Sequence, residues 1–359
     1  MAKKSVVPFG PQHPVLPEPI HLDLVMEDEE ILEAIPSIGY VHRGLESLVE
    51  KKDFKEMVYV TERVCGICSF MHGMGYCNAL ENIMEVEVPE RGKYLRTIWC
   101  EMSRLHSHLL WLGLLADAFG FEALFMQTWR IREKILDMFE ISTGGRVIFS
   151  VNTIGGVLKD MPEDMLRSFE ATLDGMAAEL KESTDVFLND YSVKSRLCEI
   201  GILSKEDALR LGAVGPMMRA SGIEIDMRKT GYGAYSDLDF KIITSNECDS
   251  YARCKVRIGE IFQSVAIIKQ AIAKIPNGDI SVPVKGNPNG EYFMRVEQPR
   301  GEAFYYVKAN GTKFLDRMRV RTPTFANLPA MLETLKGAQY ADVPILILTI
   351  DPCISCTER

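Results

Sequence analysis

Two Cys-x-x-Cys pairs lie near opposite ends of this chain and have the residue type and spacing of a metal site. Cys65 and Cys68 form the first pair, and Cys353 and Cys356 form the second. Four thiolates can surround a soft metal ion as a tetrahedral cage. A zinc ribbon folds locally around its ion and separates its two pairs by only about 15–20 residues. Here most of the chain separates them, so one cage can form only where the two ends of a large fold meet in its core.

A second interpretation treats the two pairs as unrelated, one as half of a structural zinc site and the other as a buried or redox-active pair. The remaining five cysteines show no paired spacing, and we assign them no function; they are Cys77, Cys100, Cys198, Cys248 and Cys254. Nine cysteines, an odd number, in a chain that starts without a secretory signal favour a reducing compartment and metal binding over a disulfide framework.

The residues around both pairs resemble the two signature motifs of the nickel-iron hydrogenase large subunit. The first motif reads Arg-Val-Cys-Gly-Ile-Cys over residues 63–68, with His72 four positions later, and the second reads Asp-Pro-Cys-x-x-Cys over residues 351–356. Three other segments are similar to the quinone-site (49-kDa-type) subunit of respiratory complex I; they are residues 9–14, 42–46 and 321–325. A chain with both sets resembles the group 4 energy-converting, membrane-bound nickel-iron hydrogenases of the Ech type.

The resemblance implies a nickel-iron centre held by all four paired cysteines. Cys65 and Cys353 would be terminal nickel ligands, whereas Cys68 and Cys356 would bridge nickel to iron. Carbon monoxide and cyanide, which no side chain supplies, would complete the iron. An iron–sulfur cluster requires about four further thiolates, and no such set remains in the sequence. Electrons would therefore arrive through a separate iron–sulfur small subunit, with reduced ferredoxin as the indirect donor.

The resemblance also places three polar side chains beside the metals. His72 follows Cys68 by four positions on a helical segment, and it would donate a hydrogen bond to a bridging thiolate. Glu18 lies between two prolines, which alone indicates a solvated loop, but the resemblance makes it the first proton relay beside a terminal cysteine. Arg300 lies in a Pro-Arg-Gly turn. Its guanidinium would either face water or lie over the open face of the metals.

The sequence departs from the hydrogenase pattern at two places. Residues 106–108 read His-Ser-His and lack the aspartate that many hydrogenases have in this segment. Arg359 stands where many of them have a histidine that, with the glutamate at position 46, holds a structural magnesium ion. Because an arginine stays protonated and cannot bind a cation, we expect Arg359 to pair directly with Glu46, without magnesium. The carbonyl oxygen of Leu328, a further ligand by resemblance, then loses that role.

The elements that must position these residues are predicted to be mostly helices. Helical spacing of apolar residues covers eight segments: residues 43–51, 52–62, 70–85, 91–119, 122–141, 162–188, 204–211 and 248–275. Alternating patterns predict one hairpin in residues 19–31 and a second from residues 292–296 and 303–307. Residues 343–350 form a buried strand or helix. Residues 213–247 are predicted to be irregular because they are rich in Gly, Ser and Asp.

We therefore expect an α+β fold that is mainly α, with a central bundle of long helices and small β elements near the N-terminus and before the C-terminal motif. Residues 1–359 would form a single hydrogenase large-subunit domain. Within it, residues 1–40 would form an N-terminal β element and residues 41–275 the helical bundle. Residues 276–359 would form a C-terminal β/helix segment that carries the second cysteine pair.

Composition restricts the partners. A net charge of −9 and a pI near 5.4 argue against a nucleic-acid surface. No apolar run approaches the roughly 20 residues that span a bilayer. The resemblance places the chain on the cytoplasmic side of the cell membrane, as a peripheral part of a complex with other hydrophilic subunits and with integral membrane subunits that translocate ions.

Three functions remain in competition. The first is reversible reduction of protons to hydrogen at a nickel-iron centre. The second is a non-catalytic quinone-site subunit of a complex I-like oxidoreductase, which explains residues 9–14 and 42–46 but leaves the four paired cysteines without a role. The third is a structural subunit held together by zinc, which the large separation of the two pairs disfavours.

Overall fold

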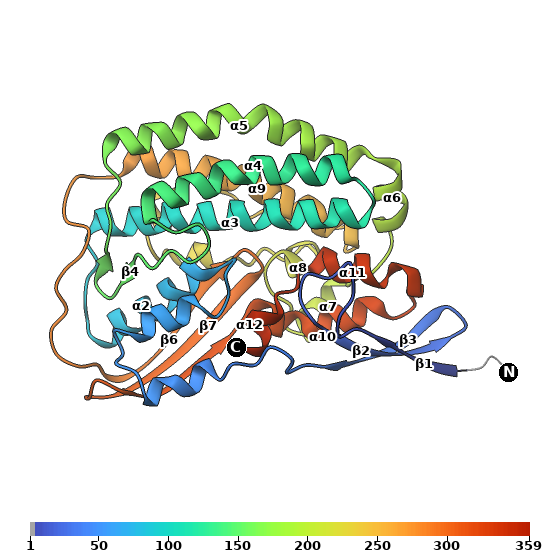
Figure 1. The fold of residues 1–359 in the computed structure, drawn as a ribbon, viewed down its shortest axis with the longest axis horizontal. Helices are drawn as coiled ribbons and strands as arrows, with labels where there is room; N and C mark the ends of the chain where they lie inside the picture. The colour runs from blue at the N-terminus through green and yellow to red at the C-terminus, as the bar shows by residue number, and fades with distance from the viewer. Residues whose placement is uncertain (1–3) are drawn as a thin grey trace.

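Four long helices pack into a bundle that forms the upper layer of the molecule in Figure 1. They are α3 (Glu90–Ala118), α4 (Glu122–Thr143), α5 (Glu163–Asn189) and α9 (Ser250–Lys274). The computed structural model describes residues 4–359. Helix α3 packs against both α4 and α9, and α5 covers the outer side of that pair. Buried side chains therefore line α3 on nearly all sides, whereas α5 buries only one stripe.

Shorter elements fill the space below this layer. The other α-helices are α1 (Met57–Glu62), α2 (Ser69–Ile83), α6 (Tyr191–Leu197), α7 (Lys205–Arg210), α8 (Pro216–Arg219), α10 (Pro323–Leu335), α11 (Val343–Ile350) and α12 (Ile354–Glu358). Four 3₁₀ turns are η1 (Leu45–Glu50), η2 (Met227–Thr230), η3 (Tyr235–Asp237) and η4 (Tyr340–Asp342).

Three small antiparallel sheets complete the fold of residues 4–359. Their strands are β1 (Lys4–Phe9), β2 (His21–Glu27) and β3 (Glu30–Ser37); β4 (Asn152–Thr153) and β5 (Gly156–Val157); and β6 (Asn289–Gln298), β7 (Gly301–Asn310) and β8 (Leu315–Arg321).

The N-terminal sheet has the order β1-β2-β3. Every second residue of β2 is buried, and these side chains pack on α10 and α11. Asp28 occupies the turn between β2 and β3 with a φ of 55°. Residues 10–20 form the loop from β1 to β2. Glu18 lies in this loop and bonds the backbone of the C-terminal segment.

The C-terminal sheet has the order β6-β7-β8, and helix α2 lies across β6 and β7 (Figure 1). Strand β7 alternates between buried and partly exposed residues, and its buried side includes Tyr305. Gly75 of α2 allows the close approach, because a Cβ atom there would lie only 2.8 Å from the Tyr305 ring. The sheet and α2 together support the loops that carry the two cysteine pairs.

The prediction of a mainly helical α+β fold is confirmed, and the long helices agree with their predicted ranges within a few residues. Two helical predictions were too long, because residues 43–51 yield only the 3₁₀ turn η1 and residues 52–62 yield only α1. Phe54 explains the second difference, since its side chain is buried and its amide bonds the Lys313 carbonyl, which holds this stretch out of a helix. Residues 343–350 are the helix α11. Each predicted hairpin gains a third strand.

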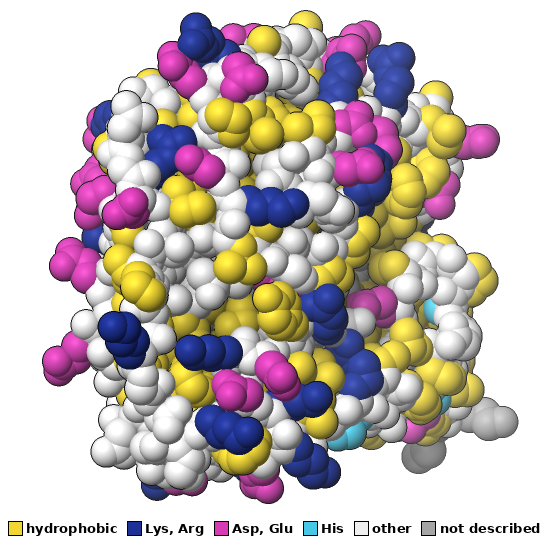
Figure 2. All heavy atoms as spheres, turned by 60° about the vertical axis from the view of Figure 1, so that its left-hand side comes forward, with side chains coloured by type: hydrophobic (Ala, Val, Ile, Leu, Met, Phe, Trp, Pro, Cys, Tyr) yellow, Lys and Arg dark blue, Asp and Glu magenta, His cyan; other side chains and the backbone are white. Residues whose placement is uncertain are grey.

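The surface carries charges of both signs. On the face shown in Figure 2, acidic and basic side chains are interspersed with apolar ones. Among residues 4–359, the structure contains no helix with the length and apolar character needed to cross a bilayer. This arrangement agrees with the acidic, mixed-charge composition.

Candidate metal centre

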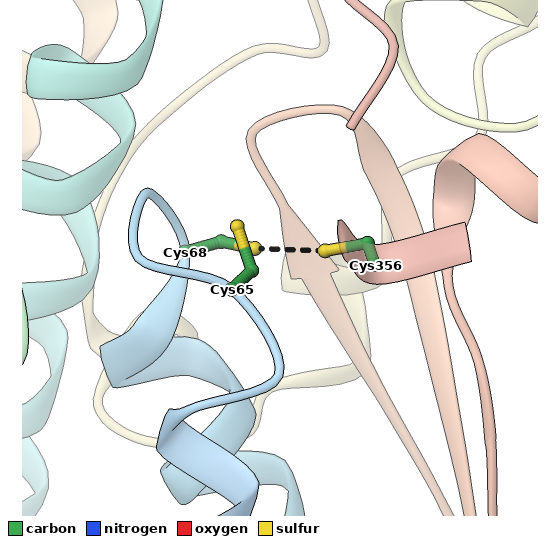
Figure 3. Close-up of side chains that lie close together, drawn as sticks. All are labelled: Cys65, Cys68 and Cys356. Atoms are coloured by element: carbon green, nitrogen blue, oxygen red, sulfur yellow. Dashed lines mark hydrogen bonds between the residues drawn. The ribbon is translucent and has the colours of Figure 1, made fainter. Parts of the chain in front are cut away.

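The two cysteine pairs meet in the interior, although they lie at opposite ends of the sequence. The Sγ atoms of Cys65 and Cys353 are 3.3 Å apart, and those of Cys68 and Cys356 are 3.5 Å apart. All four side chains are buried and form a separate cluster with Val64. Figure 3 shows the sulfur atoms of three of them turned toward one another, from the loop before α2 and from α12. We call these four residues the thiolate cage.

Helix starts fix the direction of the cage sulfurs. Cys68 is the N-cap of α2, and Cys353 is the N-cap of α12. The Cys353 sulfur accepts a hydrogen bond from the backbone amide of Cys356, and the Cys65 sulfur accepts one from the amide of Ile67. Asp351 ends α11 in a left-handed conformation, with φ 57°, and so turns the chain into the second pair. Local backbone geometry therefore aims both pairs into one space.

The cage dimensions fit a metal and exclude disulfide bonds. A disulfide requires an S–S distance of about 2.05 Å, far below the separations observed here. Metal–sulfur bonds of about 2.3 Å in a tetrahedral arrangement give sulfur–sulfur edges of about 3.8 Å, close to the separations in the cage. The sulfur atoms of Cys65, Cys68 and Cys356 all lie within 4.8 Å of one another. The donor set consists of soft sulfur atoms and suits zinc, nickel or iron.

The charge of the cage also calls for a cation. Burial raises the pKa of the Cys68 and Cys356 thiols well above the usual value. Hydrogen bonds from the other cage thiols, first from Cys353, hold the pKa of Cys65 well below it. Without a cation the cage therefore stabilises one thiolate, and a bound metal must supply the positive charge that ionises the others.

Arg43 ties the two halves of the cage together, and sequence analysis assigned it no role. Its guanidinium donates hydrogen bonds to the carbonyl oxygens of Arg63 and Val64, just before the first pair, and of Ser355, inside the second pair. In addition, the Thr324 hydroxyl accepts a hydrogen bond from the backbone amide of Cys353. These contacts fix the relative position of two loops that are far apart in sequence.

His72 lies against the cage and is neutral. Its Nε2 is 3.4 Å from the Cys356 sulfur, and its Nδ1 contacts the hydroxyl of Tyr305 on β7. Burial lowers the pKa of His72 to about 4, and burial also raises the pKa of Tyr305 well above its usual value. Because Tyr305 keeps its proton and donates it to Nδ1, the imidazole proton lies on Nε2 and points to Cys356. Sequence analysis missed Tyr305, although alternation along β7 indicated a buried side chain.

Glu18 reaches the backbone of the second pair. Its carboxylate accepts hydrogen bonds from the amides of Ile354 and Ser355 and from the Ser355 hydroxyl. The side chain is half-buried, so it has access both to solvent and to the loop between Cys353 and Cys356. A carboxylate at this position can carry a proton between the surface and the cage.

Arg300 is buried beside the cage, which excludes the interpretation as a turn residue in water. Only 5% of the residue is exposed, and its guanidinium bonds the carboxylate of Asp351 at 2.8 Å. Asp351 also faces Arg257 at 3.4 Å. Burial opposes the charge of Arg300, but Asp351 and the cage cysteines raise the Arg300 pKa well above its usual value. A permanent positive charge therefore lies next to the sulfurs.

Glu46 and Arg359 meet behind the second pair. The Arg359 Nε atom is 3.0 Å from Glu46 Oε1, and Arg319 contacts the other carboxylate oxygen at 3.2 Å. The amide of Val320 also donates to Glu46. A divalent cation at Glu46 would face two guanidinium groups, so the charge at this position does not fit magnesium. Leu328 lies in α10 and packs in the hydrophobic core.

Replacing Arg359 by alanine should loosen the last turn of the chain. Loss of one partner of a buried ion pair typically costs about 3–5 kcal/mol, but Glu46 keeps Arg319 and the Val320 amide, so we expect about 1–2 kcal/mol. Thermal unfolding and nickel content measure the effect, and Arg317→Ala is a nearby surface control. An Arg359→Ala protein with unchanged unfolding temperature and metal content would contradict this interpretation.

The two histidines of residues 106–108 and the five other cysteines are either buried in the core or partly exposed. His106 and His108 are fully buried on α3; the first accepts a hydrogen bond from Arg132, and the second bonds Glu260. Three of the other cysteines are buried in helices and behave as small core side chains; they are Cys77, Cys100 and Cys254. Cys198 and Cys248 are partly exposed.

Two family models match the chain, each over a different part of it. The pattern described as nickel-dependent hydrogenase matches residues 43–117, which include the first cysteine pair. The pattern described as the 49-kDa subunit of respiratory-chain NADH dehydrogenase matches residues 118–287 and 283–359, which include the second pair.

Individual relatives match over almost the whole chain. The membrane-bound hydrogenase subunit alpha of Pyrococcus furiosus is 37% identical over 98% of this chain and 87% of its own length. The carbon monoxide-induced hydrogenase of Rhodospirillum rubrum is 37% identical over 98% of this chain and 99% of its own. A chain of the membrane-bound sulfane sulfur reductase, an archaeal respiratory membrane complex, has a similar structure, with a TM-score of 0.94 and 31% identity over 99% of this chain and 98% of that one.

Proposed function

The chain belongs to the family of large subunits shared by group 4 membrane-bound nickel-iron hydrogenases and the 49-kDa subunit of complex I, and from this membership we propose that it catalyses the reversible reduction of protons to hydrogen. The convergence of four buried cysteine sulfurs from opposite ends of the sequence carries the proposal. A subunit that only lines a quinone site has no use for this cage.

The thiolate cage would hold a nickel-iron group whose iron also carries carbon monoxide and cyanide. When bound, that group would supply a redox-active site at which protons and electrons combine. Cys65, Cys68, Cys353 and Cys356 would hold this group through their sulfur atoms. Soft thiolates suit such a metal because they tolerate changes in its oxidation state.

Side chains around the cage would orient and supply the reactants. His72 donates its Nε2 proton to the Cys356 sulfur and so adjusts the charge on that ligand. Arg300, fixed by Asp351, places a positive charge beside the cage, where it stabilises negative charge that develops during reduction. Glu18 would take up a proton at the surface and pass it toward Cys353. The buried setting of the cage excludes bulk water.

The chain would work as one subunit of a larger membrane-bound complex. Its relatives include a membrane-bound hydrogenase subunit and a chain of a respiratory membrane complex, while residues 4–359 contain no helix suited to crossing a bilayer. We propose that an iron–sulfur small subunit delivers electrons from reduced ferredoxin and that membrane subunits couple the reaction to ion translocation. The chain would then be peripheral, on the cytoplasmic side of the membrane.

Exchange of deuterium gas with water protons tests this function with the purified complex. This exchange requires the metal centre and a proton path but no particular electron donor. We expect exchange, and also hydrogen evolution with reduced ferredoxin. A nickel-loaded complex that reduces a quinone but shows no exchange would instead support the second candidate, a quinone-site subunit, which the match to the 49-kDa pattern favours.

A further inference from the structure

A cluster of buried charged side chains lies between the long helices and the C-terminal sheet, next to the thiolate cage. We call it the buried ion cluster. Its seven members are each at most 3% exposed: Glu101 and Arg104 on α3, Arg219 on α8, Asp226 and Arg228 at η2, Glu260 on α9, and Glu297 on β6. Five segments of the chain therefore contribute charges to a space that water barely reaches.

Short contacts connect the members into one network. The Arg219 guanidinium contacts the carboxylate of Glu260 at 2.7 Å and that of Glu297 at 2.8 Å, and so links the two. The Arg228 guanidinium contacts the carboxylate of Asp226 at 2.7 Å and that of Glu101 at 3.3 Å, and so links these two. The other links come from Arg104, which contacts Glu101 at 3.4 Å and donates to the backbone carbonyl of Glu297. The charges of the cluster must therefore be counted together.

The charges do not balance, because the cluster contains four carboxyl groups and three guanidinium groups. An arginine remains protonated in a protein. Full ionisation would leave one negative charge without a guanidinium partner in the cluster, which burial makes strongly unfavourable. The nearby Arg257 pairs with Asp351 instead. The cluster therefore has to bind one proton, either on a carboxyl group or on His108, whose Nε2 is 2.9 Å from Glu260.

The contacts select Glu297 as the group that binds this proton. Glu260 faces two nitrogens of Arg219 and also His108, and Glu101 accepts hydrogen bonds from Tyr235 and Ser264 in addition to its guanidinium contacts. Glu297 bonds one nitrogen of Arg219 and the amide of Met227. Its carboxylate is therefore compensated less well than those of Glu260 and Glu101.

The pKa values agree with this selection. Burial raises the pKa of Glu297 to about 7, whereas burial lowers the pKa of His108 to about 4 and so keeps it neutral. Burial also opposes ionisation of Glu260, but Arg219 holds its pKa well below the usual value. The charged groups that face Glu297 are Arg219 from α8, Arg104 from α3 and Asp226 before η2. Glu260 of α9 lies on the far side of Arg219. The Tyr232 hydroxyl accepts a hydrogen bond from the backbone amide of Glu297.

Buried polar atoms without a protein partner lie beside the same network. Within residues 4–359 they include both polar side-chain atoms of Gln298, Nδ1 of His108 and Nε of Arg257. Buried polar groups of this kind normally bind ordered water. Water bound at these atoms would give a proton a route to and from the cluster.

We propose that the buried ion cluster is a proton-binding site that holds one exchangeable proton on the carboxyl group of Glu297. Loading converts the carboxylate and one proton from solvent water into the neutral acid, and it moves no electron. The site goes beyond the proposed function, because its charge count is independent of any metal. Its place is significant for that function, since Glu297 precedes Arg300 by three residues and Arg300 borders the cage. The site can therefore store a proton beside a centre that consumes protons.

Infrared difference spectra of the purified holoprotein, recorded on the acidic and alkaline sides of neutral pH, test the proposal. In the wild-type protein the carbonyl stretch of a protonated carboxyl group should disappear as the pH rises through about 7. Glu297→Gln, which copies the neutral acid, should lack this band. Glu291→Gln, an exposed change on the same strand, should keep it. The same band in Glu297→Gln, or no titrating carboxyl band in the wild-type protein, overturns the proposal.

A second variant, Glu260→Gln, tests the charge count. It also keeps the proposal testable if Glu297→Gln does not fold. Glu260→Gln leaves three carboxyl groups for three guanidinium groups, so the cluster no longer needs the proton. We expect the Glu297 band to disappear at a pH at least one unit lower than in the wild-type protein. An unchanged titration in Glu260→Gln would show that the cluster does not share its charge, which also overturns the proposal.

The pH dependence of stability gives an independent readout. A carboxyl group whose pKa is higher in the folded protein stabilises the fold below its unfolded pKa, and this contribution is lost as the pH rises through the folded value. Between about pH 4.5 and about pH 7 the wild-type protein should therefore lose this contribution of Glu297. The unfolding temperature of the wild-type protein should fall relative to that of Glu297→Gln over this range. Parallel pH dependences in the two proteins would count against the site.

Discussion

Serine in place of any one of the four cage cysteines is expected to abolish hydrogen evolution and to lower the nickel and iron content of the protein. The positions are Cys65, Cys68, Cys353 and Cys356. Each sulfur lies within 3.5 Å of a partner from the other pair, so each contributes to one centre. A serine hydroxyl is a harder and less basic donor than a thiolate and binds such metals poorly. Activity should therefore fall to background in all four variants.

Cys198→Ser and Cys248→Ser are matched controls for this experiment. Both cysteines are partly exposed and lie outside the cluster that contains the cage. They should retain wild-type activity and metal content, which would exclude a general effect of removing a thiol. Full hydrogen evolution with a normal nickel content in any one cage variant would refute the assignment, because no other paired cysteines could substitute.

Glu18→Gln is expected to slow hydrogen evolution and deuterium exchange by about 100-fold or more while the metal centre remains intact. General acid–base groups typically contribute about 10²–10⁴-fold to a rate. The amide keeps the size of the carboxylate but cannot carry a proton. The exchange rate, measured with deuterium gas, reports the proton path, and the infrared spectrum of the same sample reports the metal centre.

The Ser355→Ala variant separates the proton role of Glu18 from its structural role. It removes the hydroxyl that bonds the Glu18 carboxylate but leaves the carboxylate and its contact with the Ile354 amide. We expect only a small effect on exchange. If Glu18→Gln exchanged at nearly the wild-type rate with a normal infrared spectrum, the proton would have to enter elsewhere. Equal losses in both variants would indicate that Glu18 acts by holding the loop.

The sequence contained enough information to predict the long helices and the meeting of the two cysteine pairs. Apolar side chains recur with helical spacing through residues 91–119 and 248–275, and the observed α3 and α9 differ from these ranges by only one or two residues. The cysteine spacing predicted a shared site because a local knuckle was excluded. These inferences depend on patterns within one segment or on the chemistry of one residue type.

Contacts between distant segments could not be predicted in the same way. Arg43 binds three carbonyl oxygens, and carbonyl oxygens carry no signal in the sequence. Tyr305 could be assigned to a buried face but not to His72. Short helices such as α6 and the edge strand β1 depend on tertiary packing more than on pattern.

The buried ion cluster was missed for a related reason. Charged residues on a helix usually indicate a solvent-exposed face. Glu101 and Arg104 on α3, and Glu260 on α9, instead lie among apolar residues on fully buried parts of their helices.

Metal analysis of the purified complex, combined with its infrared spectrum, tests the central claim most directly. We predict nickel in an amount equal to that of this chain, together with the sharp bands of metal-bound carbon monoxide and cyanide, and loss of the nickel and of these bands in Cys65→Ser. Zinc bound to the cage in place of nickel, in a preparation that evolves hydrogen and shows no such bands, would contradict the account.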